Sequence, residues 1–272
     1  MSIEQPGTSP LDYNLVTYPG SMVEYRGPEA DLSLPNILCL GGSETFGRFV
    51  LKPFPALLGE ALQRPVVNLG VLNAGLDLIL KDPVVNMALG CADQVVLQIT
   101  GTHTMTNRFY RVHPRRNDRF LRASPALETI YRNTDFTEFH FVRHMLGVLH
   151  ETSPDRFAIV VRELQEAWVA RMVGLIDRLE VPVHLLWLAA NPPSDSVGDW
   201  EPNNDPLFVT NEMLEKVSKA AKSLTVITAD DEELENPTKG MFFGPREAAV
   251  ARIMPNVDQH FRTAEELADH LD

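Results

Sequence analysis

Short apolar runs alternate along this chain with longer stretches in which apolar residues recur at helical spacing. From residue 35 onward the short runs are rich in leucine and β-branched residues, as expected of strands buried on both faces. They predict strands at residues 36–40, 65–69, 94–100, 183–189 and 224–228. Helical spacing between and after them predicts helices at residues 54–62, 76–88, 155–179, 209–222 and 263–271.

Strands that alternate with helices favour an α/β fold, here a three-layer α/β/α sandwich around a mostly parallel sheet. Residues 1–35 are rich in proline, glycine and tyrosine with weak periodicity, so we expect an N-terminal arm there. Residues 36–272 then form a single α/β domain. A polar and aromatic stretch at about 101–153 interrupts the alternation, and we predict an insertion after the third strand, partly helical over 136–150.

The bulk composition excludes several classes of protein. The chain has 272 residues and a net charge of −13, which argues against nucleic-acid binding because that function needs a basic face. Its two cysteines, Cys39 and Cys91, lie in or beside apolar runs, which is typical of reduced thiols and gives no sign of a disulfide or a metal site. There is no signal-peptide pattern and no run of about 18 apolar residues. We therefore expect a cytoplasmic protein without a membrane span.

Glycine and small polar residues follow three of the predicted strands. The first strand runs through two glycines into Ser43, the second into residues 68–75 and the third into residues 101–104. The carboxyl ends of parallel strands meet at one edge of a sheet, so these residues are expected to lie together. A serine where a strand turns into a helix can be a nucleophile beside free N–H groups. In the alternative interpretation Ser43 is only a helix N-cap.

This order of motifs resembles the SGNH/GDSL hydrolase superfamily, which has a flavodoxin-like fold. The first motif of that family is Gly-Asp-Ser with a glycine four residues after the serine. Residues 41–47 read Gly-Gly-Ser-Glu-Thr-Phe-Gly, so Gly42 replaces the aspartate. The second motif supplies a glycine that binds the oxyanion, which matches Gly70. The third is Gly-x-Asn-Asp, and here His103 stands in place of the asparagine.

The last motif of the family is Asp-x-x-His near the C-terminus. His260 matches its histidine, but Val257 holds the position of the aspartate and Asp258 lies one residue too close. The resemblance implies that Ser43 is the nucleophile and His260 the general base, with Asp258 as the nearest carboxylate to orient it. It also implies an oxyanion site formed by the N–H groups of Ser43 and Gly70, with a side chain from His103 or Asn107.

The function implied is that of a serine-dependent ester hydrolase, or of an acyl or acetyl transferase. Its substrate would be small or carbohydrate-linked and anionic, and the reaction needs no cofactor. A second hypothesis starts from residues 42–49, which have the glycine spacing of a phosphate-binding loop with Arg48 in place of lysine and Phe49 in place of the Mg²⁺-binding hydroxyl. That loop would suit a metal-independent sulfo- or phospho-group transferase. A third hypothesis is a non-catalytic binding protein with the same fold.

Six arginines fall within residues 107–122 of this acidic chain. Arginine side chains present forked donors that suit carboxylate, sulfate or phosphate groups. Arg115 and Arg116, which follow Pro114, are the strongest candidates for binding an anionic substrate. The arginines could instead pair with nearby acids such as Glu128. The aromatic residues of the same insertion are compatible with a homo-oligomer.

Overall fold

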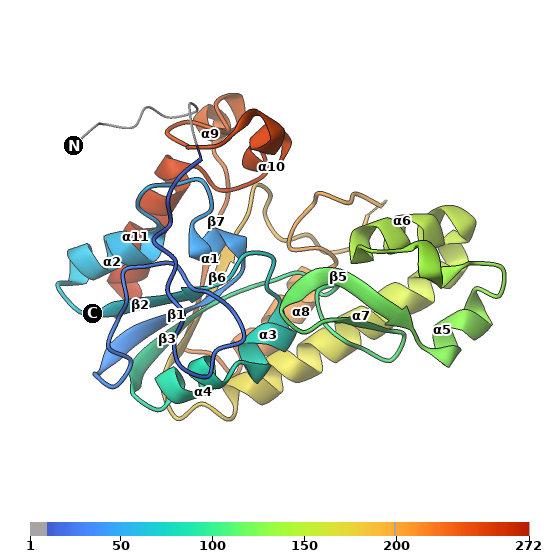
Figure 1. Ribbon diagram of the computed structural model, residues 1–272, viewed down its shortest axis with the longest axis horizontal. Coiled ribbons are helices and arrows are strands. Elements are labelled where there is room, and N and C mark those ends of the chain that lie inside the picture. The colour runs from blue at the N-terminus through green and yellow to red at the C-terminus, as the bar shows by residue number, and fades with distance from the viewer. Residues whose placement is uncertain (1–9, 199, 272) are drawn as a thin grey trace.

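The computed structural model describes residues 10–198 and 200–271, and a parallel five-stranded sheet lies at its centre (Figure 1). All four strand pairs are parallel, and the order of strands is β2-β1-β3-β6-β7. The strands are β1 (Asn36–Gly41), β2 (Val66–Gly70), β3 (Ala92–Gln98), β6 (Val183–Leu188) and β7 (Ser223–Ile227). The five predicted strands are confirmed, and their order is that of the flavodoxin-like sheet.

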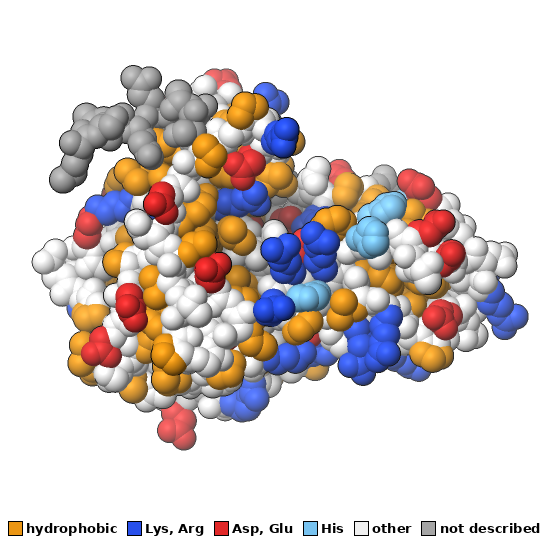
Figure 2. Space-filling view, in the orientation of Figure 1, with side chains coloured by type: hydrophobic (Ala, Val, Ile, Leu, Met, Phe, Trp, Pro, Cys, Tyr) orange, Lys and Arg blue, Asp and Glu red, His pale blue; other side chains and the backbone are white. Residues whose placement is uncertain are grey.

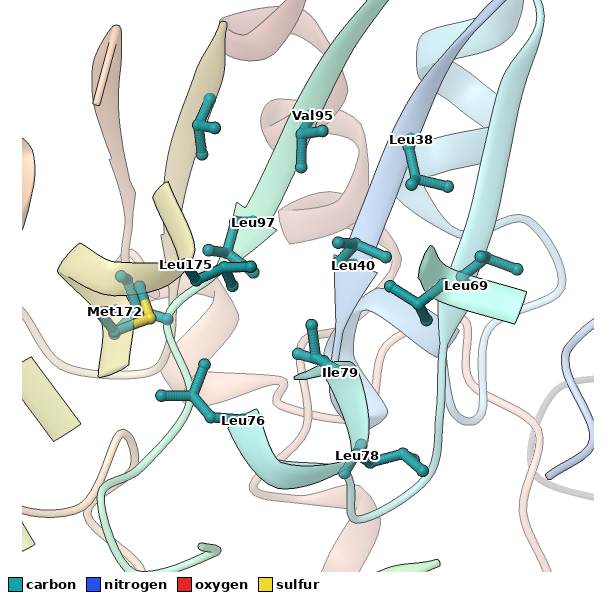
Figure 3. Close-up of a cluster of buried hydrophobic side chains, with 14 of the residues drawn as sticks. Leu38, Leu40, Leu69, Leu76, Leu78, Ile79, Val95, Leu97, Met172 and Leu175 are labelled. Carbon is teal, nitrogen blue, oxygen red and sulfur yellow. The ribbon is translucent and has the colours of Figure 1, made fainter. Parts of the chain in front are cut away.

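Helices cover both faces of the sheet, so the predicted α/β/α sandwich is confirmed (Figure 1). Four of them pack on one face: α3 (Leu76–Lys81), α4 (Pro83–Leu89), α7 (Pro154–Ile176) and α8 (Asn211–Ser218). Two pack on the other, α2 (Phe54–Leu62) and α11 (Val257–Leu271). Figure 3 shows Leu40 and Leu97 of the sheet facing Leu76, Ile79 and Met172 of the first group.

Two predicted helices differ from the observed ones because of caps that apolar spacing does not reveal. The helix expected at 76–88 is broken between α3 and α4, since Asp82 accepts the N–H of Val84 and so caps α4. Helix α11 begins at Val257 rather than at residue 263. There Asn256 Oδ1 accepts hydrogen bonds from the N–H groups of Asp258 and Gln259. This cap begins the helix several residues before the apolar residues at helical spacing from which it was predicted.

The stretch expected to be an insertion contains an antiparallel hairpin of β4 (Tyr110–His113) and β5 (Arg116–Ala123). It also contains α5 (Pro125–Ile130), the short 3₁₀-helix η1 (Phe136–Glu138) and α6 (Val142–Thr152), which with part of α7 enclose a separate apolar cluster. This hairpin was not predicted. Its exposed arginines alternate with buried Tyr110 and Val112, as in a strand with one buried face, but the many charges made the segment look like a polar loop.

The remaining elements are short: α1 (Ser43–Phe46), α9 (Asp231–Glu235), η2 (Pro245–Glu247) and α10 (Ala248–Ala251). Within residues 10–198 and 200–271, none of the helices has the length and apolar character needed to span a membrane.

The N-terminal arm is fixed to the domain by the buried side chain of Arg26. Its guanidinium donates to the carbonyl oxygens of Phe46, Gly47, Val50 and Leu51, at 2.6–3.2 Å. Val16 and Tyr25 exchange backbone hydrogen bonds and close the arm upon itself. Burial lowers the pKa of Arg26 to about 10, which still leaves the guanidinium charged at neutral pH. The arm therefore holds the end of α1 and the loop that follows it.

Replacing this cation tests the role of the arm. Arg26→Met should lower the free energy of unfolding by about 2–5 kcal/mol, because four carbonyl groups lose this donor and three of these hydrogen bonds are buried. Chemical denaturation measures the effect. The matched control is Glu29→Gln, an exposed change on the same arm that should leave the stability within about 0.5 kcal/mol of the parent. An equally small effect of Arg26→Met would show that the arm is not held in this way.

Candidate active site

A cavity of about 260 Å³ opens at the carboxyl edge of the sheet. Strand order reverses between β1 and β3, and in sheets of this kind such a switch point is where ligands bind. The turn after β1 contributes Ser43, and the loop after β2 contributes Asn73. Residues 98–101, 103 and 104, at the end of β3 and just after it, form the floor. The structure thus brings the three predicted strand ends together.

Ser43 is the first residue of α1, and its side chain lines the cavity. Its Oγ accepts a hydrogen bond from the N–H of Asn73 at 3.0 Å. Because Ser43 begins the helix, its own N–H has no acceptor within α1. A single backbone donor therefore occupies one lone pair of Oγ, and the hydroxyl proton remains available for transfer.

Gln98, at the end of β3, holds the turn that carries Ser43. Its Oε1 accepts from the N–H of Gly42 at 2.9 Å, and from the N–H and Oγ1 of Thr45 at 3.2 and 2.6 Å. Its Nε2 donates to Oε2 of Glu44 at 2.7 Å. A Cβ on residue 41 would lie only 2.3 Å from Oε1 of Gln98, so only glycine at this position leaves room for the Gln98 side chain. One buried side chain thus fixes both sides of Ser43.

Charged groups face one another across the cavity. Burial raises the pKa of Glu44, and the charge of Asp205 acts in the same direction, while the hydrogen bond from Gln98 and the charge of Arg143 oppose the change. Arg143, at the start of α6, donates to Oδ1 of Asp205 at 2.6 Å. The insertion and the loop before α8 therefore close the cavity through an ion pair.

His103 is the one histidine that lines this cavity in the part of the chain that the structure describes. Its side chain is buried, and burial together with the charge of Arg143 lowers its pKa well below the usual value. The backbone at this position is held by the hydroxyl of Tyr110, which donates to the carbonyl oxygen of His103 at 2.8 Å. Among the described residues, Nδ1 of the ring has no hydrogen-bond partner. The ring is therefore neutral near pH 7.

His260 lies elsewhere and does not line the cavity. Its ring is fully buried and stacks on Phe54, with 6.1 Å between the ring centroids. Its Nδ1 accepts the N–H of Phe54 at 3.1 Å, at the first turn of α2. Burial lowers its pKa to about 3, so the ring is uncharged. This histidine joins α11 to α2, and the structure does not bring it together with Ser43.

Three other predicted site residues are occupied in structural roles away from the cavity. Asp258 pairs with Lys239 at 2.7 Å. The N–H of Gly70 already donates to Oδ1 of Asn68 at 2.9 Å, so it is not a free oxyanion donor. Asn107 accepts the N–H groups of the two residues that precede and begin β4. Of the expected oxyanion groups, only the N–H of Ser43 and the ring of His103 are placed at the cavity.

Arg48 does line the cavity, but the anion-loop hypothesis finds little support there. Its guanidinium pairs with Glu247 at 3.1 Å and lies 4.6 Å from the ring centroid of Phe49. The N–H groups of Gly42 and Thr45, which would have to surround a phosphate, both donate to Gln98. Arg115 and Arg116 line a second, separate cavity. Within residues 10–198 and 200–271, no group of three or more potential ligands could hold a metal ion.

Several residues of the site were not predicted. Only Gln98 has a signal in the sequence, because it is a polar residue that follows the apolar run of the third strand. Asn73 acts through its backbone, and no side-chain pattern indicates that. Arg143 and Asp205 are far apart in the chain and meet only because the insertion folds over the sheet edge.

A family model described as "Domain of unknown function (DUF6473)" matches residues 1–272 of the chain. No curated protein matches the chain. Similar solved structures include an acetylxylan esterase from Geobacillus stearothermophilus, at 14% identity and a TM-score of 0.43, covering 86% of this chain and 92% of that one. A second is the lipase Lip_vut3 from a goat rumen metagenome, at 14% identity and a TM-score of 0.41, covering 86% and 96% of the two chains.

A third is a putative GDSL-like lipase from Parabacteroides merdae, at 14% identity and a TM-score of 0.41, covering 90% of this chain and 100% of that one. With 14% identity and TM-scores below 0.5, these likenesses carry no argument about function, so activity has to be argued from the site.

Removing the amide of Gln98 tests whether it holds the Ser43 turn. Gln98→Leu should lower the free energy of unfolding by about 2–4 kcal/mol, because three buried donors lose their acceptor. Gln98→Glu keeps the acceptor oxygen but sets a second carboxylate beside Glu44. The loss in free energy of unfolding caused by Gln98→Glu should become smaller as the pH is lowered, because protonation of one carboxyl group removes the repulsion between the two. Denaturation at several pH values measures both, and a pH-independent deficit in Gln98→Glu would contradict this role.

Proposed function

We propose a function for this chain, which belongs to the family described as "Domain of unknown function (DUF6473)": it is a serine-dependent ester hydrolase with Ser43 as nucleophile and His103 as general base. The observation that carries the proposal is that both side chains line one cavity at the switch point of the sheet. A backbone N–H is also directed at Oγ of Ser43.

The reaction uses groups of this chain alone. His103 takes the hydroxyl proton of Ser43 as Oγ forms a bond to the carbonyl carbon of the ester. The N–H of Ser43 stabilises the oxyanion, and the proton passes from His103 to the departing alcohol as its bond to the acyl carbon breaks. Water then attacks the acyl-serine with the same base, which releases the acid and restores Ser43. An alcohol in place of that water would give acyl transfer.

The base works without a carboxylate partner in the part of the chain that the structure describes. No carboxylate there accepts a hydrogen bond from the ring of His103, and Nδ1 has no partner. The arrangement is therefore a Ser–His dyad, which is slower than a triad because the imidazolium is less well stabilised. The cavity of about 260 Å³ favours a short acyl group such as acetyl, on a small or carbohydrate-linked substrate.

A fluorophosphonate probe tests this assignment, because it forms an adduct only with an activated serine. Mass spectrometry should locate the adduct on Ser43, and Ser43→Ala should abolish it. His103→Gln should slow labelling by about a hundredfold, as expected for loss of a general base. His260→Gln is the matched control, since its amide can still accept the N–H of Phe54, and labelling should stay within about threefold of the parent.

Each outcome is decisive once circular dichroism shows that the variants are folded. Labelling that depends on His260 and not on His103 would transfer the role of base to His260. A folded protein that is not labelled would exclude an activated Ser43.

The pH dependence of labelling gives an independent test. Because burial lowers the pKa of His103, its neutral, basic form persists below the usual range. The acid limb of the labelling rate should therefore lie below about pH 6.5, the ordinary value for histidine. Glu44→Gln is the control, since Glu44 also titrates in this cavity, and the limb should remain in that variant. A limb that disappears with Glu44→Gln would assign the titration to the carboxyl group instead.

A further inference from the structure

A second and larger cavity, of about 780 Å³, lies between the N-terminal arm and the tip of the β4–β5 hairpin. We call it the arm–hairpin groove. The arm contributes an apolar wall that includes Leu15 and Met22, and Leu72 continues this wall from the loop after β2. The hairpin contributes Arg115, Arg116 and Arg119 on the other side. The groove is thus apolar along one wall and cationic along the other.

These arginines form no ion pair with a described carboxylate, although the charges of Arg116 and Arg119 act on neighbouring Asp118. Arg115 and Arg116 are exposed and Arg119 is half-buried. Glu24 is the only acid among the described residues that line the groove. Figure 2 shows basic side chains gathered beside a histidine in the middle of this face, where Figure 1 has the hairpin. In a chain with a net charge of −13, such a cluster points to a negatively charged ligand.

The cationic wall is held in place before any ligand arrives. Buried Asn117 anchors the hairpin tip, because its Oδ1 accepts the N–H groups of Gly75 and Leu78 at 2.9 and 3.1 Å. Its Nδ2 donates to the carbonyl oxygen of His113 at 3.0 Å. The guanidinium of Arg119 lies 4.6 Å from the ring centroid of Phe141. Binding an anion here therefore requires little ordering of the backbone, which favours affinity.

The groove and the Ser43 cavity lie on two sides of one loop. Val71 and Leu72 line the groove, whereas the next two residues, Asn73 and Ala74, line the Ser43 cavity. Helix α1 is shared in the same way, because Phe46 faces the groove while Ser43 faces the cavity. The two cavities are therefore neighbours, and a ligand that crosses this loop would contact both.

We propose that the arm–hairpin groove binds the anionic end of the substrate whose acyl ester lies at Ser43. The anionic end is a phosphate, sulfate or carboxylate group that the forks of Arg115, Arg116 and Arg119 can contact, and an apolar segment beside it packs on Leu15 and Leu72. The identification as a substrate subsite rests on the proposed function of Ser43. The binding of an anion in the groove does not.

Anion binding is tested first, without catalysis. Ser43→Ala protein is titrated with inorganic tripolyphosphate in a calorimeter. Changing Arg115, Arg116 and Arg119 together to Gln should weaken binding by about tenfold or more. The matched control changes Arg108, Arg111 and Arg122 to Gln, which removes the same charge from the same insertion but from residues that do not line the groove. Binding should then stay within about threefold of the parent.

The absence of binding to the folded Ser43→Ala protein, or an equal loss in both triple variants, would overturn the groove as an anion site.

The link to Ser43 is tested with two acetyl esters that differ only in charge, 8-acetoxyoctanoate and the same ester capped as its carboxamide. The groove triple variant should raise KM for the charged ester by about fivefold or more, and leave kcat and the capped ester unchanged. An equal effect on both esters would overturn the substrate subsite. If Ser43 is not labelled and neither ester is cleaved, the proposed function has failed, and the calorimetric result then decides the anion site alone.

Discussion

The hydrogen bonds of the Gln98 amide are the contact on which the geometry of the candidate site depends. A turn of two glycines and a four-residue helix has few backbone hydrogen bonds of its own to fix it. Gln98 adds one acceptor shared by three donors and one donor given to Glu44. Because the amide belongs to β3, the position of Ser43 is tied to the central strands of the sheet. The cavity is therefore as rigid as the sheet edge on which it lies.

Two segments outside the sheet complete this edge. The arm holds the far end of α1 through Arg26, and the hairpin tip is anchored to the start of α3 by Asn117. Each contact uses a buried polar side chain to hydrogen-bond backbone groups at a helix end. The carboxyl edge thus acquires two cavities, separated by the loop of residues 71–74, from segments that are far apart in the sequence.

The strands and the sandwich could be predicted from the sequence, because an apolar run buried on both faces is visible residue by residue. Ser43 and the loop after β3 could also be predicted, because glycine and small polar residues directly follow these apolar runs. The hairpin could not, because exposed arginines alternate there with buried Tyr110 and Val112. The partners of His260 could not be predicted either, since its contact with Phe54 joins residues that lie 206 positions apart.

The buried histidines His103 and His260 show why composition and motif order do not assign roles. Both are uncharged because burial lowers their pKa, and each has one ring nitrogen without a partner among the described residues. What separates them is the neighbouring group. The ring of His260 accepts a backbone N–H and stacks on an aromatic ring, so its lone pair is already used to start α2. His103 lines the cavity that Ser43 also lines. A base needs a free lone pair and a proton to receive, and of these two rings only that of His103 shares a cavity with Ser43.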